Sequence, residues 1–346
     1  MTVVIDGTTG INTPGVVNTA AETIATTLAV TGVTTLQGLT AGKGAGAVAT
    51  NTAFGTSALA ANTTGASNTA VGFEALQTAT ADANTAVGRL ALKGTTTGEH
   101  NTVMGSGAAY LNTTGTSLVG IGSSALEANS TGSSNVAIGR SALTANTTAS
   151  NNTVVGHQAG YSGTTAANNV GVGYIALYSL SSGSSNTAIG KDAGAGITSG
   201  SNNICLGNGA GNNSSPSGNI TSASNLICMG NDSITNAYIR VSWTVTSDAR
   251  DKTEIAPVIH GLNFVNQLNP VSYKFTNNRT NKTPTGDTHY GFLAQDVLAL
   301  EGTNPIIIDN KDEEHLKYRG ESLVPILVKA IQELKAEFDA YKATHP

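Results

Sequence analysis

A pentapeptide close to Asn-Thr-Ala-Val-Gly recurs along the chain at nearly constant spacing, and this repeat constrains the fold more than any other feature. Its last residue is Gly55, Gly72, Gly88, Gly105, Gly122, Gly139, Gly156, Gly173, Gly190 and Gly207. Eight of the nine intervals are 17 residues and one is 16, and a looser copy ends at Gly230 after 23 residues. A period of this size kept for ten copies is typical of a solenoid, in which each repeat forms one coil against its neighbours.

Two columns of residues precede each Gly. The residue immediately before it is large and apolar: Phe54, Val71, Val87, Met104, Ile121, Ile138, Val155, Val172, Ile189 and Leu206. We expect this to be a core column. The residue two positions before the Gly is smaller: Ala53, Ala70, Ala86, Val103, Gly120, Ala137, Val154, Gly171, Ala188 and Cys205. Because adjacent residues of a strand point to opposite faces, we expect the small column to pack closely against another surface.

Two further slots support the same fold. Ala follows each Gly by three residues in all ten copies: Ala58, Ala75, Ala91, Ala108, Ala125, Ala142, Ala159, Ala176, Ala193 and Ala210. Asn precedes the Gly by four residues in nine of ten copies, with Leu118 as the exception. Stacked Asn side chains can hydrogen-bond along a ladder. Together the slots predict a mainly β fold, a parallel β-solenoid of 17-residue repeats, about 48 Å long for ten coils.

A single chain is expected to be insufficient for this shaft. A 17-residue coil is thin, and both of its faces carry apolar or small residues, so association of identical chains around an axis is needed to cover one face. Over residues 50–230 the repeat, followed by x-x-Ala-Leu, also resembles the head repeats of trimeric autotransporter adhesins and related repeats of phage tail fibres. Those are trimeric parallel β-rolls with a shorter common repeat, which implies a homotrimer here with one enlarged loop.

A change of composition near Thr246 divides the chain. Residues 1–246 hold 14 Asp, Glu, Lys and Arg, whereas residues 247–346 hold 25. The second part has the charged and aromatic content of an ordinary α/β domain. We therefore expect four segments: an N-terminal attachment segment at 1–45, the solenoid shaft at 46–230, a linker strand at 231–246, and a small α/β domain at 247–346 that ends in a long helix.

Two motifs of this last segment point to one family. Residues 247–252 read Ser-Asp-Ala-Arg-Asp-Lys, and residues 289–297 read His-Tyr-Gly-Phe-Leu-Ala-Gln-Asp-Val. The pair resembles the intramolecular chaperone domain of phage tailspikes and fibres, the peptidase S74 family. The resemblance implies a domain that assists trimer folding and then cuts itself free, with Ser247 as nucleophile and Lys252 as base. It implies a supporting role for Asp248, Arg250, Gly291, Phe292 and Gln295.

The chemistry of a Ser–Lys pair agrees with these roles. A serine hydroxyl is a weak nucleophile until a base takes its proton, and a Ser–Lys pair is one known arrangement. Lys252 acts as a base once burial lowers its pKa from about 10.4 towards neutrality. Burial on assembly of three subunits would couple cleavage to folding. Asp248 and Asp251 oppose the shift if they touch Lys252, unless Arg250 neutralises them.

Ring size favours one scissile bond. Attack by Ser247 on the preceding carbonyl closes a five-membered ring, whereas attack on its own carbonyl needs a strained four-membered ring. We therefore expect cleavage of Thr246–Ser247, unless another subunit supplies the nucleophile.

Residues 321–344 carry a heptad pattern. Its columns are Val324, Ile331 and Phe338, and Leu327, Leu334 and Tyr341. The pattern fits either a helix that packs against copies of itself or a single amphipathic helix on its own domain. Pro325 suits a first helical turn. We expect a coiled-coil contact between the three subunits.

Several classes of protein are excluded. The net charge of −5 and the absence of a basic cluster argue against nucleic-acid binding. No apolar run approaches 18 residues, so no membrane insertion is expected. The six histidines show no metal-ligand spacing, and we expect no metal and no cofactor. The first residues lack the basic start and apolar core of a signal peptide, so we expect assembly in a bacterial cytoplasm, with Cys205 and Cys228 reduced and filling the core.

The sequence therefore predicts a virion structural protein, a phage tail fibre or tailspike for host attachment. Beyond single-turnover self-cleavage, no turnover enzyme is expected in the shaft. The expected partners are two further copies, other phage tail or fibre proteins, and a bacterial surface receptor, a glycan. One alternative is a polysaccharide-degrading tailspike, which usually needs paired carboxylates. The acidic residues of the repeats share no slot: Glu74, Asp82, Glu99, Glu127 and Asp192. A bacterial surface adhesin is the other alternative, and the lack of a signal peptide and anchor disfavours it.

Overall fold

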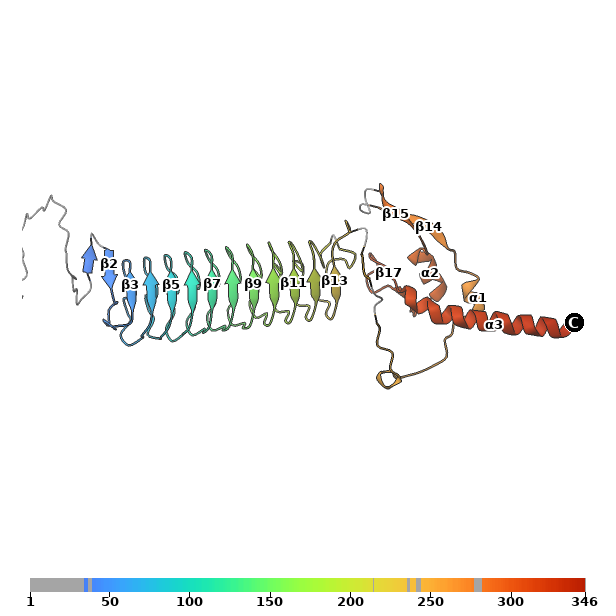
Figure 1. Ribbon diagram of the computed structural model, residues 1–346, viewed down its shortest axis with the longest axis horizontal. Coiled ribbons are helices and arrows are strands. Elements are labelled where there is room, and N and C mark those ends of the chain that lie inside the picture. The colour runs from blue at the N-terminus through green and yellow to red at the C-terminus, as the bar shows by residue number, and fades with distance from the viewer. Residues whose placement is uncertain are drawn as a thin grey trace, which may run out of the picture.

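The computed structural model describes residues 34–36, 39–213, 215–234, 237–240, 244–276 and 282–345. It has a long β-solenoid, a small α/β domain, and a C-terminal helix that points away from the solenoid (Figure 1). Most of the predicted attachment segment, residues 1–45, lies outside the described residues. The described residues of the predicted linker, 231–246, are turns and irregular backbone.

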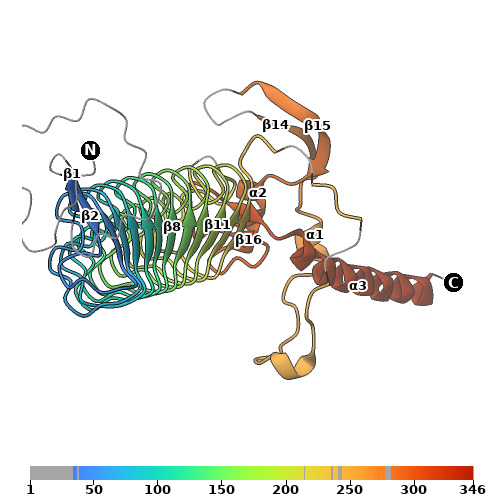
Figure 2. The same ribbon diagram turned by 60° about the vertical axis from the view of Figure 1, so that its left-hand side comes forward.

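The solenoid has one three-residue strand per coil, and Figure 2 shows the coils stacked along the shaft. Its strands are β3 (Thr52–Phe54), β4 (Thr69–Val71), β5 (Thr85–Val87), β6 (Thr102–Met104), β7 (Val119–Ile121), β8 (Val136–Ile138), β9 (Thr153–Val155), β10 (Val170–Val172), β11 (Thr187–Ile189), β12 (Ile204–Leu206) and β13 (Ile227–Met229). Each pairs in parallel with the next, with equal slots in register. A hairpin of β1 (Thr34–Leu36) and β2 (Leu39–Gly42) pairs antiparallel with β3. The predicted parallel β-solenoid is confirmed.

The two columns before each Gly face the opposite way from the sequence prediction. The small column lies inside the coil, where Ala70 and Ala188 are 0% exposed. The large apolar residues, which we call the outer column, lie on the outside of the sheet; Phe54 and Ile189 are 46% exposed and Met104 is 51% exposed. The prediction of a large core column was therefore wrong, because the interior of so narrow a coil is already occupied.

Residues from the corner after each Gly occupy that interior. The Ala three positions after the Gly is buried in every coil, and the next residue is a buried Leu in six coils: Leu59, Leu76, Leu92, Leu126, Leu143 and Leu177. A Cβ placed on Gly171 would lie 3.2 Å from Cδ1 of Leu177, which packs directly beneath the strand. Only a small side chain fits above it, since interiors are close-packed.

The Asn ladder is confirmed. The backbone N–H of one Asn donates to the side-chain oxygen of the Asn in the preceding coil, as Asn169 does to Asn152 at 2.9 Å. Leu118 still donates its N–H to Asn101, at 2.9 Å. These bonds satisfy buried polar groups that would otherwise destabilise the fold. A second buried ladder, which the sequence reasoning missed, is formed by Asn112, Asn129 and Asn146.

A left-handed backbone conformation explains the Gly that ends each strand. Gly122 has φ of 132°, a region that L side chains rarely adopt. A Cβ at this position would lie 2.5 Å from the carbonyl oxygen of Gly139 in the next coil. The coils stack at strand spacing because this column has no side chains.

Replacing Ala125 with Leu is expected to overpack the shaft. Ala125 is 0% exposed, so the added carbons have no free volume to enter. We expect the free energy of unfolding to fall by about 1–3 kcal/mol, and the melting temperature of the protein to fall with it. Ser123→Leu is the control in the same coil, because Ser123 is exposed. An unchanged melting temperature for Ala125→Leu would contradict the packing described here.

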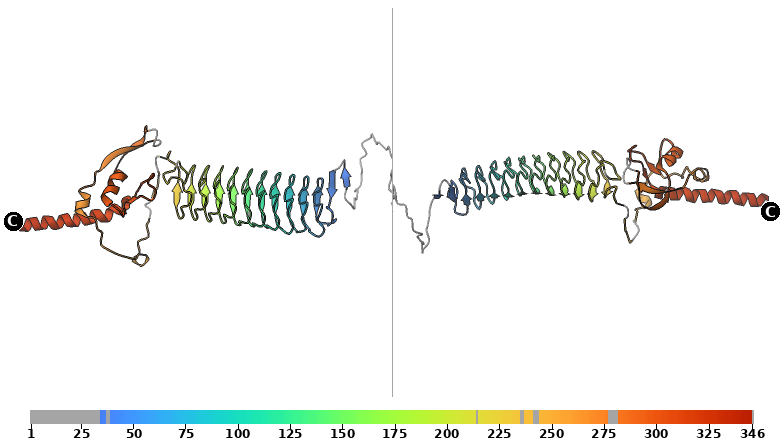
Figure 3. Two further views of the ribbon diagram at one scale, coloured as in Figure 1. Left: turned by 180° about the vertical axis from the view of Figure 1, so that it is seen from behind. Right: turned by 90° about the horizontal axis from the view of Figure 1, so that it is seen from above.

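The C-terminal domain is a small α/β unit. Its elements are the 3-10 turn η1 (Ala249–Asp251), α1 (Leu262–Val265), β14 (Val271–Thr276), β15 (Pro284–Gly291), α2 (Ala294–Glu301), β16 (Ile308–Asp309), β17 (Lys317–Tyr318), the 3-10 turn η2 (Gly320–Ser322) and α3 (Leu323–Thr344). Its core gathers Phe264, Val297, Ile307, Ile308, Leu323 and Ile326. Figure 3 shows α3 extending beyond the rest of the domain. In the described part of the chain, no helix has both the length and the apolar character needed to cross a bilayer.

Candidate functional site

Ser247 and Lys252 lie in hydrogen-bond contact. The Nζ of Lys252 donates to the Oγ of Ser247 at 2.7 Å and to the carbonyl oxygen of the same residue at 3.1 Å. This distance is within the reach that proton transfer between a nucleophile and its base requires. Both side chains and Thr246 are exposed in the single chain.

One turn of 3-10 helix brings the two residues together. Asp248 caps η1, accepting the backbone N–H of Arg250 at 2.9 Å. Two nitrogens of the Arg250 guanidinium also donate hydrogen bonds to the Asp248 carboxylate, at 2.6 and 3.1 Å. The turn between them reverses the chain, so Lys252 returns to Ser247. We call residues 247–252 the dyad loop.

The Asp248–Arg250 pair also sets the charge near the dyad. The hydrogen bond from Arg250 lowers the pKa of the Asp248 carboxyl, which is therefore ionised at neutral pH. Its negative charge faces the guanidinium of Arg250 and not the amine of Lys252. This is the neutralisation that the sequence analysis assigned to Arg250, here for Asp248.

The second motif builds the domain and does not reach the dyad loop. Gly291 ends β15, and a Cβ there would lie 3.1 Å from the ring of Tyr273. Phe292 packs against the domain core, with its ring 6.1 Å from that of Tyr318. Gln295 is exposed in the first turn of α2. Figure 1 shows the dyad loop, golden at the lower edge, standing away from β14, β15 and α2.

Two residues of α3 that the sequence analysis missed hold the chain just after the dyad loop. Lys329 Nζ donates to the carbonyl oxygens of Val258 and Ile259 at 2.6 and 3.3 Å. Glu333 accepts the backbone N–H of Leu262 at 2.6 Å. Their spacing of four residues on the helix face opposite the heptad was a signal that could have identified them.

The heptad residues of α3 are all exposed in the single chain. Their exposed fractions range from 38% at Leu327 to 67% at Ile331. The set is Val324, Leu327, Ile331, Leu334, Phe338 and Tyr341. The helix instead contacts its own domain through Leu323, Ile326 and Ala330, which are buried. The heptad columns therefore remain free to contact another chain.

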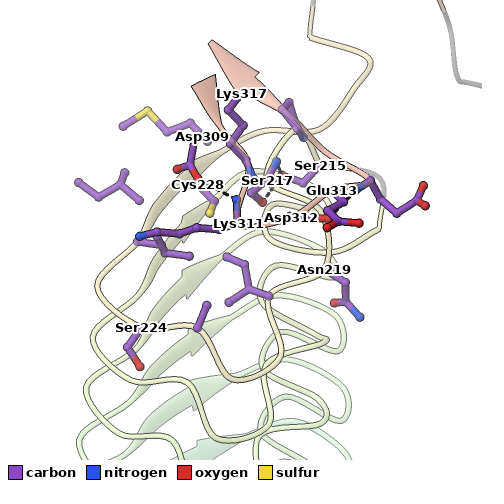
Figure 4. A pocket seen from close by; sticks show the side chains of 17 residues that line it. Ser215, Ser217, Asn219, Ser224, Cys228, Asp309, Lys311, Asp312, Glu313 and Lys317 are labelled. Atoms are coloured by element: carbon purple, nitrogen blue, oxygen red, sulfur yellow. Dashed lines mark hydrogen bonds between the residues drawn. The ribbon is translucent and has the colours of Figure 1, made fainter. Parts of the chain in front are cut away.

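A pocket of about 870 Å³ lies where the domain meets the last coil (Figure 4). Charged residues of the 309–317 segment, among them Lys311 and Lys317, face apolar residues of the coil such as Ile227 and Met229. The pocket is lined by residues 215–229 and 309–317 and by none of the predicted site residues. It marks the contact between shaft and domain and not the site of the Ser–Lys chemistry.

Cys228 lines this pocket, and Cys205 lies next to it on the preceding strand. Cys205 and Cys228 face each other across β12 and β13, and both are buried, as expected for residues that fill the core. The hydrogen bond that joins the two thiols, together with burial, raises the pKa of Cys205.

Comparison with known proteins identifies a family model that matches part of the C-terminal domain. Residues 247–302 match the family model Peptidase_S74, whose description is "Chaperone of endosialidase". The match begins at Ser247 and covers the dyad loop, β14, β15 and α2. No curated protein and no solved structure matches the chain. Residues 247–302 are therefore similar to the chaperone-of-endosialidase family, in a chain where they follow a parallel β-solenoid.

Proposed function

We propose that this chain is a homotrimeric phage tail fibre or tailspike segment for host attachment, whose C-terminal domain drives trimerisation and then cleaves the Thr246–Ser247 bond. A chaperone-of-endosialidase domain after a β-solenoid fits a tail-fibre-like or tailspike-like protein. The observation that carries the cleavage step is the 2.7 Å contact between Lys252 Nζ and Ser247 Oγ at the start of the matched segment. The further partners we propose are other tail proteins and a bacterial surface glycan.

The cleavage step needs only groups of the chain and water. Neutral Lys252 takes the hydroxyl proton of Ser247 while Oγ bonds to the carbonyl carbon of Thr246. The C–N bond of Thr246–Ser247 then breaks, and the departing amine receives the proton from Lys252. This leaves Thr246 as an ester on the Ser247 oxygen. Water hydrolyses the ester, restores the hydroxyl and separates the two parts of the chain.

Exposure of the dyad loop supports coupling of this step to assembly. A lysine becomes an effective base when burial favours its neutral form. In the single chain Ser247 and Lys252 are exposed, and a neighbouring copy that covers the loop would supply the burial. Cleavage would then follow assembly, and an unassembled chain would stay whole.

Two apolar surfaces of the single chain support self-association. The outer column runs along the shaft with large side chains in water, among them Met104 and Ile189. The heptad of α3 adds a second exposed apolar stripe beyond the shaft. Exposed apolar surface of this extent is typical of interfaces, and identical chains around one axis bury equal surfaces of each copy. The outer column thus takes the role that the sequence analysis gave to the small column.

The proposal predicts two products from the purified wild-type protein. Mass spectrometry should detect residues 1–246 and 247–346 as separate chains, because the Ser–Lys pair cuts before Ser247. Light scattering should give three times the mass of residues 1–246 for the shaft fragment. A chain that stays whole after prolonged folding would contradict the cleavage, and a monomeric shaft would contradict the trimer.

The polysaccharide-degrading alternative gains no support from the shaft carboxylates. Glu74 forms an ion pair with Lys93 at 2.6 Å. Asp82 accepts the backbone N–H of Ala66 at 2.7 Å. These two residues stabilise the coils, which disfavours them as a pair of catalytic acids.

A further inference from the structure

The chain between the dyad loop and α1 is anchored to α3. Residues 253–261, which we call the arm, join the dyad loop to α1. Residues 253–259 are exposed, so burial contributes little to holding the arm in place. At its end, Lys329 binds the carbonyl oxygens of Val258 and Ile259, and Glu333 accepts the N–H of Leu262. These contacts join residues 70 and 71 positions apart in sequence.

The two anchors form a coupled pair on the helix. Lys329 Nζ lies 3.6 Å from Glu333 Oε1, one helical turn away. Gly261 lies directly against the carboxylate, because a Cβ there would be 2.2 Å from Glu333 Oε2. The lysine donates to two backbone carbonyl oxygens, and the glutamate accepts a backbone N–H three residues further along, so the pair holds this part of the chain through both kinds of backbone group. We call Lys329 and Glu333 the anchor pair.

The anchor pair and the heptad lie on opposite faces of α3. In a heptad with Val324 and Ile331 at position a and Leu327 at position d, Lys329 takes position f and Glu333 position c. The a and d residues are exposed, whereas the c, f and g side of the helix faces its own domain through Ile326 and Ala330. One rigid helix therefore presents an unpartnered apolar stripe on one face and holds the arm of the dyad loop on the other.

We propose that Lys329 and Glu333 are positioning residues for self-cleavage, which hold the dyad loop at a fixed place relative to the helix that assembles the trimer. The inference rests on the proposed cleavage function. When three copies of α3 pack by their heptads, the anchor pair sets where each dyad loop lies relative to the neighbouring chains. The burial that activates Lys252 then depends on the arm being held.

Loss of the anchors should slow cleavage without removing the chemistry. Ser247 and Lys252 keep their local contact through η1, but the loop samples more positions relative to its neighbours. Displacement of reacting groups by about 1 Å can cost about 100-fold in rate. We expect cleavage to be about 10- to 100-fold slower in an anchor variant.

The test uses the full-length chain with single substitutions. Lys329→Met and Glu333→Ala remove the anchors, whereas Glu333→Gln keeps an oxygen that can accept the N–H of Leu262. Lys335→Met and Asp339→Ala are matched controls, because they form another lysine–acid pair with a spacing of four residues on α3. Cleavage is followed by mass spectrometry over time, trimer mass by light scattering, and exchange of the amides of residues 247–262 by hydrogen exchange.

The expected result is slow cleavage by Lys329→Met and Glu333→Ala, with three chains per particle as in the controls. Faster amide exchange should be confined to residues 247–262, and Glu333→Gln should recover most of the cleavage rate. Anchor variants that form trimers and cleave at the control rate would overturn the inference. If Glu333→Ala fails to assemble, the inference is tested by the cleavage rates of Lys329→Met and Glu333→Gln, measured in the same way. An uncleaved wild-type trimer would instead refute the proposed function, and hydrogen exchange would still test whether the pair holds the arm.

Discussion

The Ser247→Ala chain is expected to remain whole under conditions in which the wild-type chain separates into two parts. The substitution removes the Oγ that lies 2.7 Å from Lys252 Nζ and leaves η1 with its Asp248 cap. Ser247 is exposed and packs in no core, so folding and trimer formation should be unchanged. We therefore expect a complete loss of cleavage with no loss of trimer formation, measured by mass spectrometry and light scattering.

Lys252→Arg tests the role of the base separately from its charge. A guanidinium keeps the positive charge and can donate to Ser247, but its pKa is far higher than that of a lysine amine and it does not act as a base near neutral pH. We expect this variant to form trimers and remain whole. Lys274→Arg, at an exposed position of β14 in the same domain, should cleave as the wild type does. Cleavage of Lys252→Arg at the wild-type rate would exclude Lys252 as the base.

The repeat made the shaft predictable, because its period is kept by local features. The Gly column marks a corner with a positive φ, the Ala column marks a buried position, and the Asn column marks a hydrogen-bonded ladder. Each of these features follows from the chemistry of one residue type. Which side chains of each strand point into the coil was not predictable in the same way. Alternation along a strand divides residues between two faces but does not say which face is inside. In this solenoid the Leu after the corner, such as Leu177, fills the interior of the coil. The inward-facing strand position can then hold only a small side chain, which is Ala, Gly, Val or Cys.

The candidate site likewise has one part that the sequence could predict and one part that it could not. The contact of Ser247 with Lys252 depends on a six-residue segment, and the motif together with an Asp248 cap makes a tight turn a reasonable expectation. The anchors Lys329 and Glu333 bind residues 70 and 71 positions earlier in sequence only after α1 has packed on α3. Contacts of this kind are set by tertiary packing, for which no local pattern near the dyad loop carries information.

Residues 1–246 expressed alone are expected to aggregate or to remain monomeric. The outer column presents an exposed or half-buried large apolar residue in each coil, and successive coils present nearly the same surface. A slip of one coil between two chains would therefore cost little, and chains without another guide should associate out of register. The C-terminal domain carries the varied side chains and the heptad of α3 that can align three chains before the shafts pack.

The same residues, released by cleavage from an assembled trimer, should stay trimeric and melt at a higher temperature. Once the shafts are aligned, separation requires several coils of the three chains to part together, so the barrier to unfolding is high. Loss of the domain then removes the element that aligned the chains during assembly, so unfolding of the trimer is not readily reversed. The comparison uses the two preparations side by side, by light scattering and thermal melting. Equally stable soluble trimers from both would mean that the domain is dispensable for this shaft, since register would then be set by the solenoid itself.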